Sequence, residues 1–310
     1  MNWFLIMSIV GAALGMFQYG YNIGCVNAPE EELKQFLNSS IIHRHNVQLS
    51  EKWIKTCFSA VVSIFVVGGM IGSLMGSFLA NKFGRRQGLL YAQVLTILGA
   101  SMMGFCKILK SYEMLLIGRF LVGVSSGIFT GISPLYIVEV SPVKIRGATG
   151  TINQLGVTMG MFCSMVLGIK SVLGGKEMWP VLFCFSIIPC LIQCILLAFM
   201  CETPRYLILS KKNIDKGRIA LQKLNGNNDV ESKVKALEKE ESEKAKECKT
   251  SVWSLICSSR LRLSLFVCIC LQLSKAFCGM IALHYYSTSF FKGGGMTTET
   301  SQFGMLILYR

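Results

Sequence analysis

Residues 57–86 read CFSAVVSIFVVGGMIGSLMGSFLANKFGRR. Residues 57–81 of this stretch carry no charged side chain, and Lys82, Arg85 and Arg86 follow at once. A helix of about twenty apolar residues matches the roughly 30 Å hydrocarbon core of a bilayer. The stretch therefore predicts a membrane-spanning helix that ends in a tight, basic turn.

The same layout recurs along the chain, and the composition agrees with it. Hydrophobic residues make up 52% and charged residues 15%, with a mean hydropathy of +0.51, whereas soluble domains carry about 25% charged residues. The apolar runs are continuous rather than alternating, which favours helices over a β-barrel. We predict an all-α, polytopic membrane protein with spans at 2–25, 57–81, 87–106, 113–138, 150–172, 179–200 and 263–290.

The net charge of +14 lies mainly in the connectors 82–86 and 144–146 and in the long segment after Cys201. With alternating spans these three places share one side of the membrane, and short Lys/Arg-rich loops mark the cytoplasmic side. We therefore expect a cytoplasmic N-terminus, a first run that is a retained helix rather than a signal peptide, and attraction to anionic lipid rather than to nucleic acid.

The composition also bears on chemistry. Of the 13 cysteines most lie inside apolar runs, where they behave as small hydrophobes, and no Cys/His arrangement has zinc spacing. No nucleophile–base pair and no ATP-binding loop stand out. We expect no metal, no cofactor and no enzymatic activity. In the outer loop 27–56, Asn38-Ser39-Ser40 is an N-glycosylation sequon, so Asn38 is a candidate glycosylation site.

Two further patterns concern packing. Glycines recur every four positions at 68/72/76 and 123/127/131, which predicts close helix–helix approach. The connector after the sixth span is rich in Glu and Lys, with pairs such as Glu231/Lys235 and Glu240/Lys244 that favour short, solvent-exposed helices. The alternative for this connector is a solvated linker.

Acidic and basic side chains gather at the predicted inner ends of the helices. Arginine forms bidentate pairs with carboxylates, and a cluster of such pairs can join helix ends in one conformation and release them in another. The candidates are Arg85, Arg86, Glu139, Arg146, Glu202 and Arg205.

Several of these motifs occur together and in order. They are Gly84-Arg85-Arg86, Gly118-Arg119-Phe120, the run from Pro134 to Gly147, 153–156 (Asn-Gln-Leu-Gly), 202–205 (Glu-Thr-Pro-Arg) and 272–274 (Gln-Leu-Ser). Together they resemble the facilitative glucose transporters of the sugar-porter branch of the major facilitator superfamily. The resemblance implies an N-terminal six-helix bundle at 1–201, a cytoplasmic helical linker at 202–262 and an incomplete C-terminal bundle at 263–310 with span 7 and the start of span 8.

The resemblance implies facilitative hexose transport by alternating access around a midplane site. A neutral sugar needs amides and hydroxyls, and Gln154 stands at the family's sugar-contacting glutamine. Gln18, Asn22, Thr130 and Gln272 are weaker candidates. Proton-coupled relatives carry an aspartate where this chain has Asn22, so uniport is expected rather than symport.

The chain departs from the family at Lys275, Ala276 and Ile281, which stand in place of amides. This leaves a second hypothesis: a transport-deficient paralogue or truncated isoform that acts as a sensor or damps a full-length transporter as a homo- or hetero-oligomeric partner. The expected partners are otherwise a hexose and the lipid bilayer, and the expected location is the plasma membrane.

Overall fold

The computed structural model describes residues 2–45, 50–225, 230–232, 234–235, 237, 259–279, 290 and 294. Every regular element in these ranges is helical. In chain order they are α1 Trp3–Gly24, α2 Glu30–His45, α3 Glu51–Lys82, α4 Arg85–Phe105, α5 Tyr112–Val140, η1 Val143–Ile145, α6 Arg146–Leu167, α7 Trp179–Cys184, α8 Ile187–Phe199, η2 Tyr206–Ser210, α9 Ile214–Asn225 and α12 Ser259–Phe277. The all-helical fold is the one predicted.

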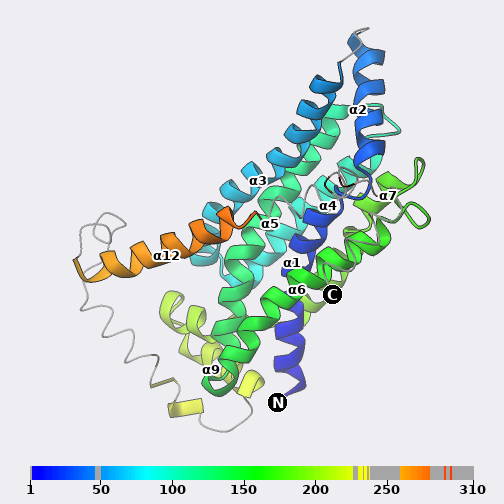
Figure 1. The fold of residues 1–310 in the computed structure, drawn as a ribbon. Coiled ribbons are helices and arrows are strands. Elements are labelled where there is room, and N and C mark those ends of the chain that lie inside the picture. Colours follow the sequence, from blue (N-terminus) through cyan, green and yellow to red (C-terminus); the bar gives the residue numbers. More distant parts are fainter. Residues whose placement is uncertain are drawn as a thin grey trace.

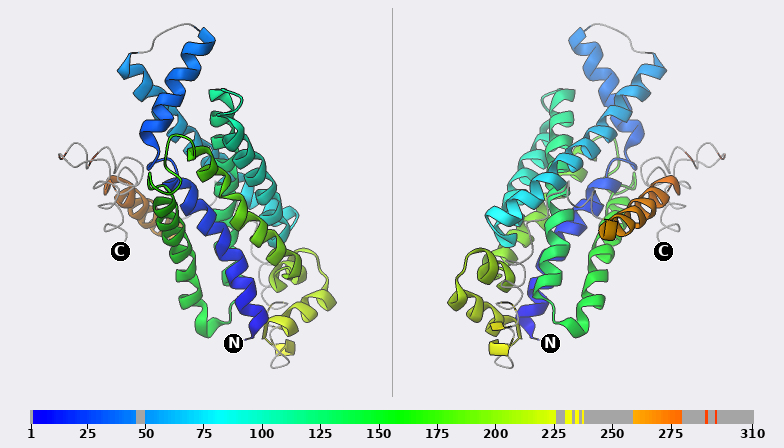
Figure 2. Two further views of the ribbon diagram at one scale, coloured as in Figure 1. Left: turned by 90° about the vertical axis from the view of Figure 1, so that its right-hand side faces the viewer. Right: turned by 90° about the vertical axis from the view of Figure 1, so that its left-hand side faces the viewer.

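The long helices form one bundle in which α5 packs along α3 and α4, and α1 lies against α5, α6 and α8 (Figure 1). α2 stands at one end of the bundle, and α9 and the N-terminus lie at the other (Figure 2). The basic connectors lie at the end of the bundle where the N-terminus and α9 lie. They contain Lys82, Arg85, Arg86, Lys144 and Arg146. We call this end of the bundle the basic end.

Glycine allows α3 and α5 to approach closely, as the four-residue spacing predicts. A Cβ on Gly72 would lie 2.0 Å from the carbonyl oxygen of Val124, and one on Gly127 would lie 2.2 Å from that of Gly69. Gly131 differs, because a Cβ there would be 3.9 Å from its nearest neighbour. The backbones are therefore in contact at Gly72 and Gly127, where no larger residue fits.

The outward faces of the bundle are apolar. Leu74 on α3 is 74% exposed and Phe199 on α8 is 68% exposed, a pattern that suits contact with lipid. Five of the described helical segments are long and apolar enough to cross a membrane, with α7 and α8 taken as one. α6 equals α1 in length but carries more polar residues. The chain is an integral membrane protein.

Helix α2 covers the bundle at the end opposite the basic end. Its buried Leu33, Phe36 and Leu37 join the core cluster there, and the Phe36 ring packs 5.2 Å from that of Trp179. Asn38 lies in the middle of α2, half-buried, with its Oδ1 buried. The sequon thus belongs to a packed helix rather than to an open loop, and its glycosylation stays a prediction.

Several boundaries differ from those expected. The predicted span 179–200 is broken between α7 and α8, and the helix predicted at 150–172 is α6, which ends at Leu167. α12 starts near the expected seventh span, whose residues 280–289 lie outside the described residues. A shorter apolar stretch of it covers Arg262–Ser274.

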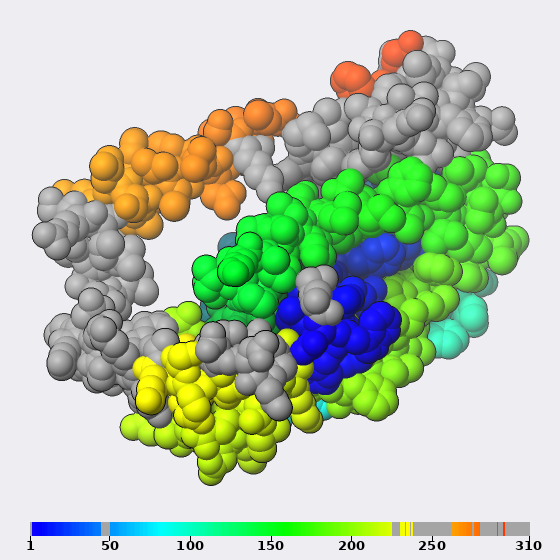
Figure 3. Space-filling model, turned by 90° about the horizontal axis from the view of Figure 1, so that it is seen from below, coloured from blue at the N-terminus to red at the C-terminus, as the bar shows by residue number. Residues whose placement is uncertain are grey.

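The connector is more than a solvated linker where it is described. Ile208, Leu221, Val230 and Val234 form a small core of their own, and α9 contacts α1. Seen from below, these segments lie beside the first turns of α1 (Figure 3). Glu231 pairs with Arg218 at 2.9 Å rather than with Lys235. The pair Glu240/Lys244 lies outside the described residues.

Candidate functional site: a polar network at the basic end

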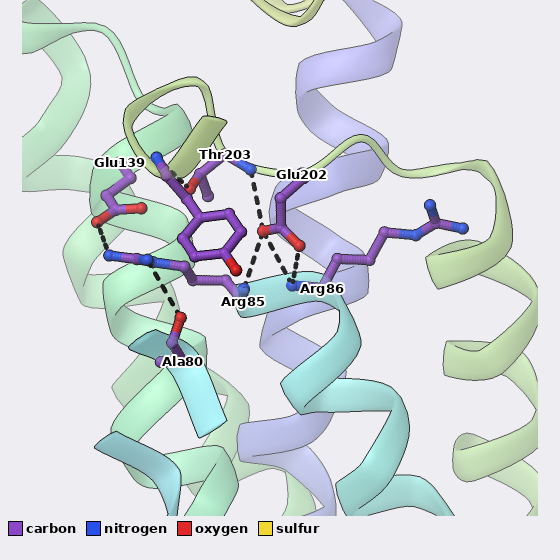
Figure 4. A network of polar contacts seen from close by, with 7 residues as sticks. Ala80, Arg85, Arg86, Glu139, Glu202 and Thr203 are labelled. Atoms are coloured by element: carbon purple, nitrogen blue, oxygen red, sulfur yellow. Dashed lines mark hydrogen bonds and ion pairs between the residues drawn. The ribbon is translucent and has the colours of Figure 1, made fainter. Parts of the chain in front are cut away.

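The network is built around the first turn of α4, which receives a carboxylate from the segment after α8 (Figure 4). Oε1 of Glu202 accepts the backbone N–H groups of Arg85 at 2.9 Å and Arg86 at 3.1 Å, and Oε2 accepts that of Arg86 at 3.2 Å. The Thr203 N–H also donates to Oε1 at 3.1 Å. The first N–H groups of a helix have no partner within it, so Glu202 serves as an N-terminal cap.

Gly84 makes this approach possible. Its φ of 101° lies in a region that is essentially open to glycine alone. A Cβ at this position would stand 2.5 Å from Oε2 of Glu202 and 2.8 Å from Cε1 of Tyr206. Two reasons therefore require glycine at this predicted turn. A side chain would strain the backbone conformation, and its Cβ would occupy the space that the Glu202 carboxylate takes.

The Arg85 side chain joins α4 to α5. Its Nη2 donates to Oε1 of Glu139 at 2.8 Å, and its Nη1 donates to the carbonyl oxygen of Ala80 at 3.3 Å. The two side chains of this ion pair are 10% and 4% exposed. Removing one partner of so buried a pair leaves an uncompensated charge, which is strongly destabilising. The pair therefore holds together as a unit or separates as a unit.

Arg86 and Tyr206 extend the network to other helix ends. Nε and Nη2 of Arg86 donate to the carbonyl oxygens of Leu197 at 2.6 Å and Ala198 at 3.0 Å, at the C-terminal end of α8. The Tyr206 hydroxyl donates to the Lys82 carbonyl oxygen at 2.9 Å, and the Arg85 guanidinium lies over its ring at 5.2 Å. One network thus joins the ends of α3, α4, α5 and α8 to the connector.

The geometry differs from the guanidinium–carboxylate forks that the sequence predicted. Arg85 and Glu139 form a side-chain ion pair, whereas Glu202 binds main-chain N–H groups. Burial raises the pKa of the Glu202 carboxyl above its ordinary value, and the N–H groups of Arg86, Thr203 and Arg85 and the charge of Arg85 oppose that rise. Carbonyls and N–H groups at helix ends thus take the place of side-chain partners.

The other two arginines of the predicted cluster, Arg146 and Arg205, lie at the starts of α6 and η2. Arg146, at the start of α6, is exposed, and its side chain makes no hydrogen bond or ion pair with residues in the part of the chain that the structure describes. Arg205 is half-buried at the start of η2.

The candidate sugar contacts fall into an exposed and a buried group. Gln154 is exposed on α6, and its main-chain carbonyl oxygen accepts a hydrogen bond from the Thr158 hydroxyl at 3.0 Å. Since 3.6 residues make one helical turn, Thr151, Gln154 and Thr158 share one face of α6. Gln272 is exposed on α12. Thr130 is half-buried and donates to the Gly127 carbonyl oxygen at 2.8 Å.

Gln18 and Asn22 are the buried candidates, each 1% exposed. Nε2 of Gln18 donates to Oε1 of Gln193 at 2.7 Å, and Nδ2 of Asn22 donates to the Gln18 carbonyl oxygen at 2.8 Å. The Asn22 carbonyl oxygen accepts Nη1 of Arg119 at 2.9 Å. Both residues are thus engaged with other helices of the bundle.

The sequence predicted no contact for three residues that contribute here: Arg119, which was named only as part of a motif, Gln193 and Tyr206. Arg119 is fully buried, with its guanidinium 4.5 Å from the centre of the Phe65 ring. Its position in an apolar span was a usable signal, because a charge at membrane depth is rare. Gln193 carried the same signal more weakly, as a glutamine inside an apolar run. Tyr206 carried none, since its role depends on a contact with a helix far away in the sequence.

Comparisons with known proteins agree with this architecture. The family profile described as "Sugar (and other) transporter" matches residues 8–309. The solute carrier family 2 facilitated glucose transporter member 3 of Gallus gallus is 40% identical over 293 residues, which cover 94% of this chain and 59% of that protein. Member 3 of Homo sapiens is 39% identical over 292 residues, with the same coverage. The chain therefore spans about three-fifths of the length of these relatives.

Solved structures share the fold. The xylose transporter XylE from E. coli, in a partially occluded inward-open conformation, superposes with a TM-score of 0.80 at 20% identity, over 99% of this chain and 70% of that one. The proton:xylose symporter XylE bound to 6-bromo-6-deoxy-D-glucose gives 0.82 at 22%, over 99% and 66%. The helical bundle, its basic-end network and the match of the family profile over nearly the whole sequence lead to one conclusion: this chain belongs to the sugar transporter family of the major facilitator superfamily.

Proposed function

We propose that this chain forms the N-terminal bundle, the connector and the start of the second bundle of a facilitative hexose transporter. The relatives at about 40% identity are named facilitated glucose transporters, which supports a hexose as the substrate. In this proposal the basic end is cytoplasmic, the protein resides in the plasma membrane, and transport proceeds by alternating access.

The uncharged side chain of Asn22, a residue whose main chain contacts Arg119, carries the proposal of uniport. Arg119 is fully buried, and its Nη1 donates to the main-chain oxygen of Asn22. A carboxylate at position 22 would be a titratable partner for this cation, whereas an asparagine amide does not exchange a proton at physiological pH. Proton carriers within membranes are usually acidic side chains. A neutral partner beside Arg119 therefore favours uniport over proton symport.

The basic-end network fits a gate that closes one face of such a transporter. It joins the ends of four neighbouring helices to the connector, through groups whose bonds depend on the relative position of those ends. A set of bonds that forms or breaks together is a two-state element of the kind that alternating access requires. In this proposal the network is made when the cytoplasmic side is closed and broken when it opens.

Hexose uptake tests the proposal. The complete reading frame that contains this chain is expressed, and uptake of radiolabelled glucose into vesicles is measured with Gln154→Ala and, as a matched control, Leu155→Ala, whose side chain is 61% exposed on the same helix. A lost hydrogen bond to a sugar hydroxyl costs about 1–3 kcal/mol, so KM should rise about tenfold for Gln154→Ala and little for the control. Equal KM values in the two variants would remove Gln154 from the sugar site, and the absence of saturable uptake in wild type would refute the function.

A second candidate function rests on Lys275. It lies on α12, one turn after Gln272, where the family resemblance expects an amide that contacts the sugar. A transport-deficient paralogue that binds hexose, or that binds a second transporter chain, would explain a cation there. Lys275→Gln distinguishes the two proposals, because uptake that appears only in this variant supports the deficient paralogue.

A further inference from the structure

Three glutamines from three helices meet inside the bundle. Gln18 lies on α1, Gln93 on α4 and Gln193 on α8, and they are 1%, 0% and 0% exposed. Nε2 of Gln18 and Nε2 of Gln93 both donate to the same oxygen, Oε1 of Gln193, the first at 2.7 Å. Amides at this depth are expensive unless they are paired. We call this set the glutamine cluster.

The mutual bonds leave part of the cluster unpaired. Oε1 of Gln18, Oε1 of Gln93 and Nε2 of Gln193 are buried and have no hydrogen-bond partner among the described residues. Exchanging oxygen and nitrogen within the amides does not pair these atoms. If all three amides are turned over, Nε2 of Gln193 donates to both neighbours, and the same three atomic positions are left without a partner.

We propose that the glutamine cluster is a binding site for an internal water molecule. One water donates two hydrogen bonds and accepts two, and buried waters in proteins make about three bonds on average. The unpaired set of two carbonyl oxygens and one amide nitrogen is complementary to it: the water donates to Gln18 and Gln93 and accepts from Gln193.

The chemistry of the site selects a neutral ligand. In either assignment of the amides the unpaired set contains both carbonyl oxygen and amide N–H, so neither an anion nor a metal cation matches all three groups. A hexose has suitable hydroxyls, but the three side chains are at most 1% exposed and already bond to one another. The inference is independent of the transport proposal, because it concerns α1, α4 and α8 and no contact with a substrate.

A cysteine provides a built-in reporter beside the cluster. The Cys190 thiol is 0% exposed and donates to the main-chain oxygen of Gln93 at 3.6 Å. Cys106, also 0% exposed, donates to the main-chain oxygen of Met103 at 2.9 Å and serves as the matched control. The two thiols differ in their distance from the glutamine cluster and not in their exposure.

Radiolytic hydroxyl-radical labelling tests the site, because X-rays split a bound water where it sits and the radical oxidises the nearest thiol. The purified protein in lipid nanodiscs is irradiated, and oxidation is followed for each cysteine by mass spectrometry. Cys190 should be oxidised several-fold faster than Cys106, and this excess should disappear in Gln193→Leu.

Equal rates at Cys190 and Cys106 in wild type would overturn the proposal, and so would an excess that persists in Gln193→Leu, since the radicals would then reach Cys190 by another route. Gln93→Leu is the second variant, for the case in which Gln193→Leu does not fold. It removes one of the two acceptors, so it should lower the oxidation of Cys190 while leaving that of Cys106 unchanged. The wild-type comparison needs neither variant.

Discussion

Replacing Glu202 should destabilise the basic end more than replacing an exposed charged residue of the connector does. In Glu202→Ala three N–H groups, those of Arg85, Arg86 and Thr203, lose their acceptor. An orphaned buried donor costs about 1–3 kcal/mol, but the Glu202 side chain is half-buried and water replaces part of the loss. We therefore expect a destabilisation of about 2–3 kcal/mol in total, which reaches beyond the upper end of about 2 kcal/mol for the loss of a single helix cap, because three N–H groups are affected.

The conservative variant separates hydrogen bonding from charge. Glu202→Gln keeps one carbonyl oxygen in a position to accept the N–H groups of α4 and removes the negative charge. That charge favours a helix N-terminus by about 0.3–1 kcal/mol, but the cost of burying it opposes this gain. We therefore expect Glu202→Gln to lose clearly less than Glu202→Ala loses.

Thermal denaturation of the purified protein in detergent is a suitable assay. About 1 kcal/mol shifts Tm by roughly 2–4 °C in domains of about 150–250 residues, the size range nearest to this bundle, so Glu202→Ala should lower Tm by about 5–10 °C. The control is Glu231→Ala, which removes an ion pair with Arg218 whose side chains are 63% and 41% exposed and which should cost less than about 1 kcal/mol. If both alanine variants have the same Tm, Glu202 is not a cap of α4 and the reasoning fails.

Four further outcomes follow from the same contacts. Gly84→Ala, which adds strain at φ 101° and displaces the carboxylate, should destabilise by about 1–3 kcal/mol in the same denaturation assay. Gly72→Ala should lower the free energy of unfolding by about 1–3 kcal/mol. Gly69→Ala is the control and should be tolerated, because its Cβ would lie 3.7 Å from the nearest atom. Similar Tm values for both variants would contradict close packing of α3 on α5. Tyr206→Phe removes the hydroxyl bond to the end of α3 and should lose about 0.5–1.5 kcal/mol, visible as a lower Tm. Burial raises the pKa of the Glu202 carboxyl, so the folded state binds a proton at this group more tightly than the unfolded state does. The stability that this group contributes is therefore lost as pH rises through its folded-state pKa. Lowering the pH from neutral to mildly acidic should raise the Tm of wild type relative to that of Glu202→Gln.

The sequence predicts the fold well because each span is specified locally. A run such as 57–81 has no alternative that satisfies its backbone in lipid, so helix type and approximate position follow from hydropathy alone. The break between α7 and α8 and the early end of α6 did not follow. Neither Phe185-Ser186 nor Gly168 differs enough in hydropathy from its surroundings to mark a boundary.

The site was predictable in composition but not in pairing. The sequence placed Arg85, Glu139 and Glu202 at one end of the bundle, and the structure brings these three together. It could not show that Glu202 binds main-chain groups, because every peptide carries the same N–H and the choice among them depends on how two distant helices approach. The side-chain bond between Gln18 and Gln193 was also hidden, because it depends on how α1 and α8 approach each other.

In the proposed gate, main-chain partners would give the basic end a two-state character. Side chains of an exposed ion pair can follow each other through rotamer changes as their helices shift, so such a pair weakens gradually. The N–H groups that Glu202 binds are fixed to the first turn of α4, and the carbonyls that Arg86 binds are fixed to the last turns of α8. Since hydrogen bonds weaken steeply when distance and angle depart from their narrow range, a small displacement of α4 relative to α8 and the connector breaks these bonds together. Helix ends joined in this way move as a unit or not at all, which is the property that a gate between two conformations needs.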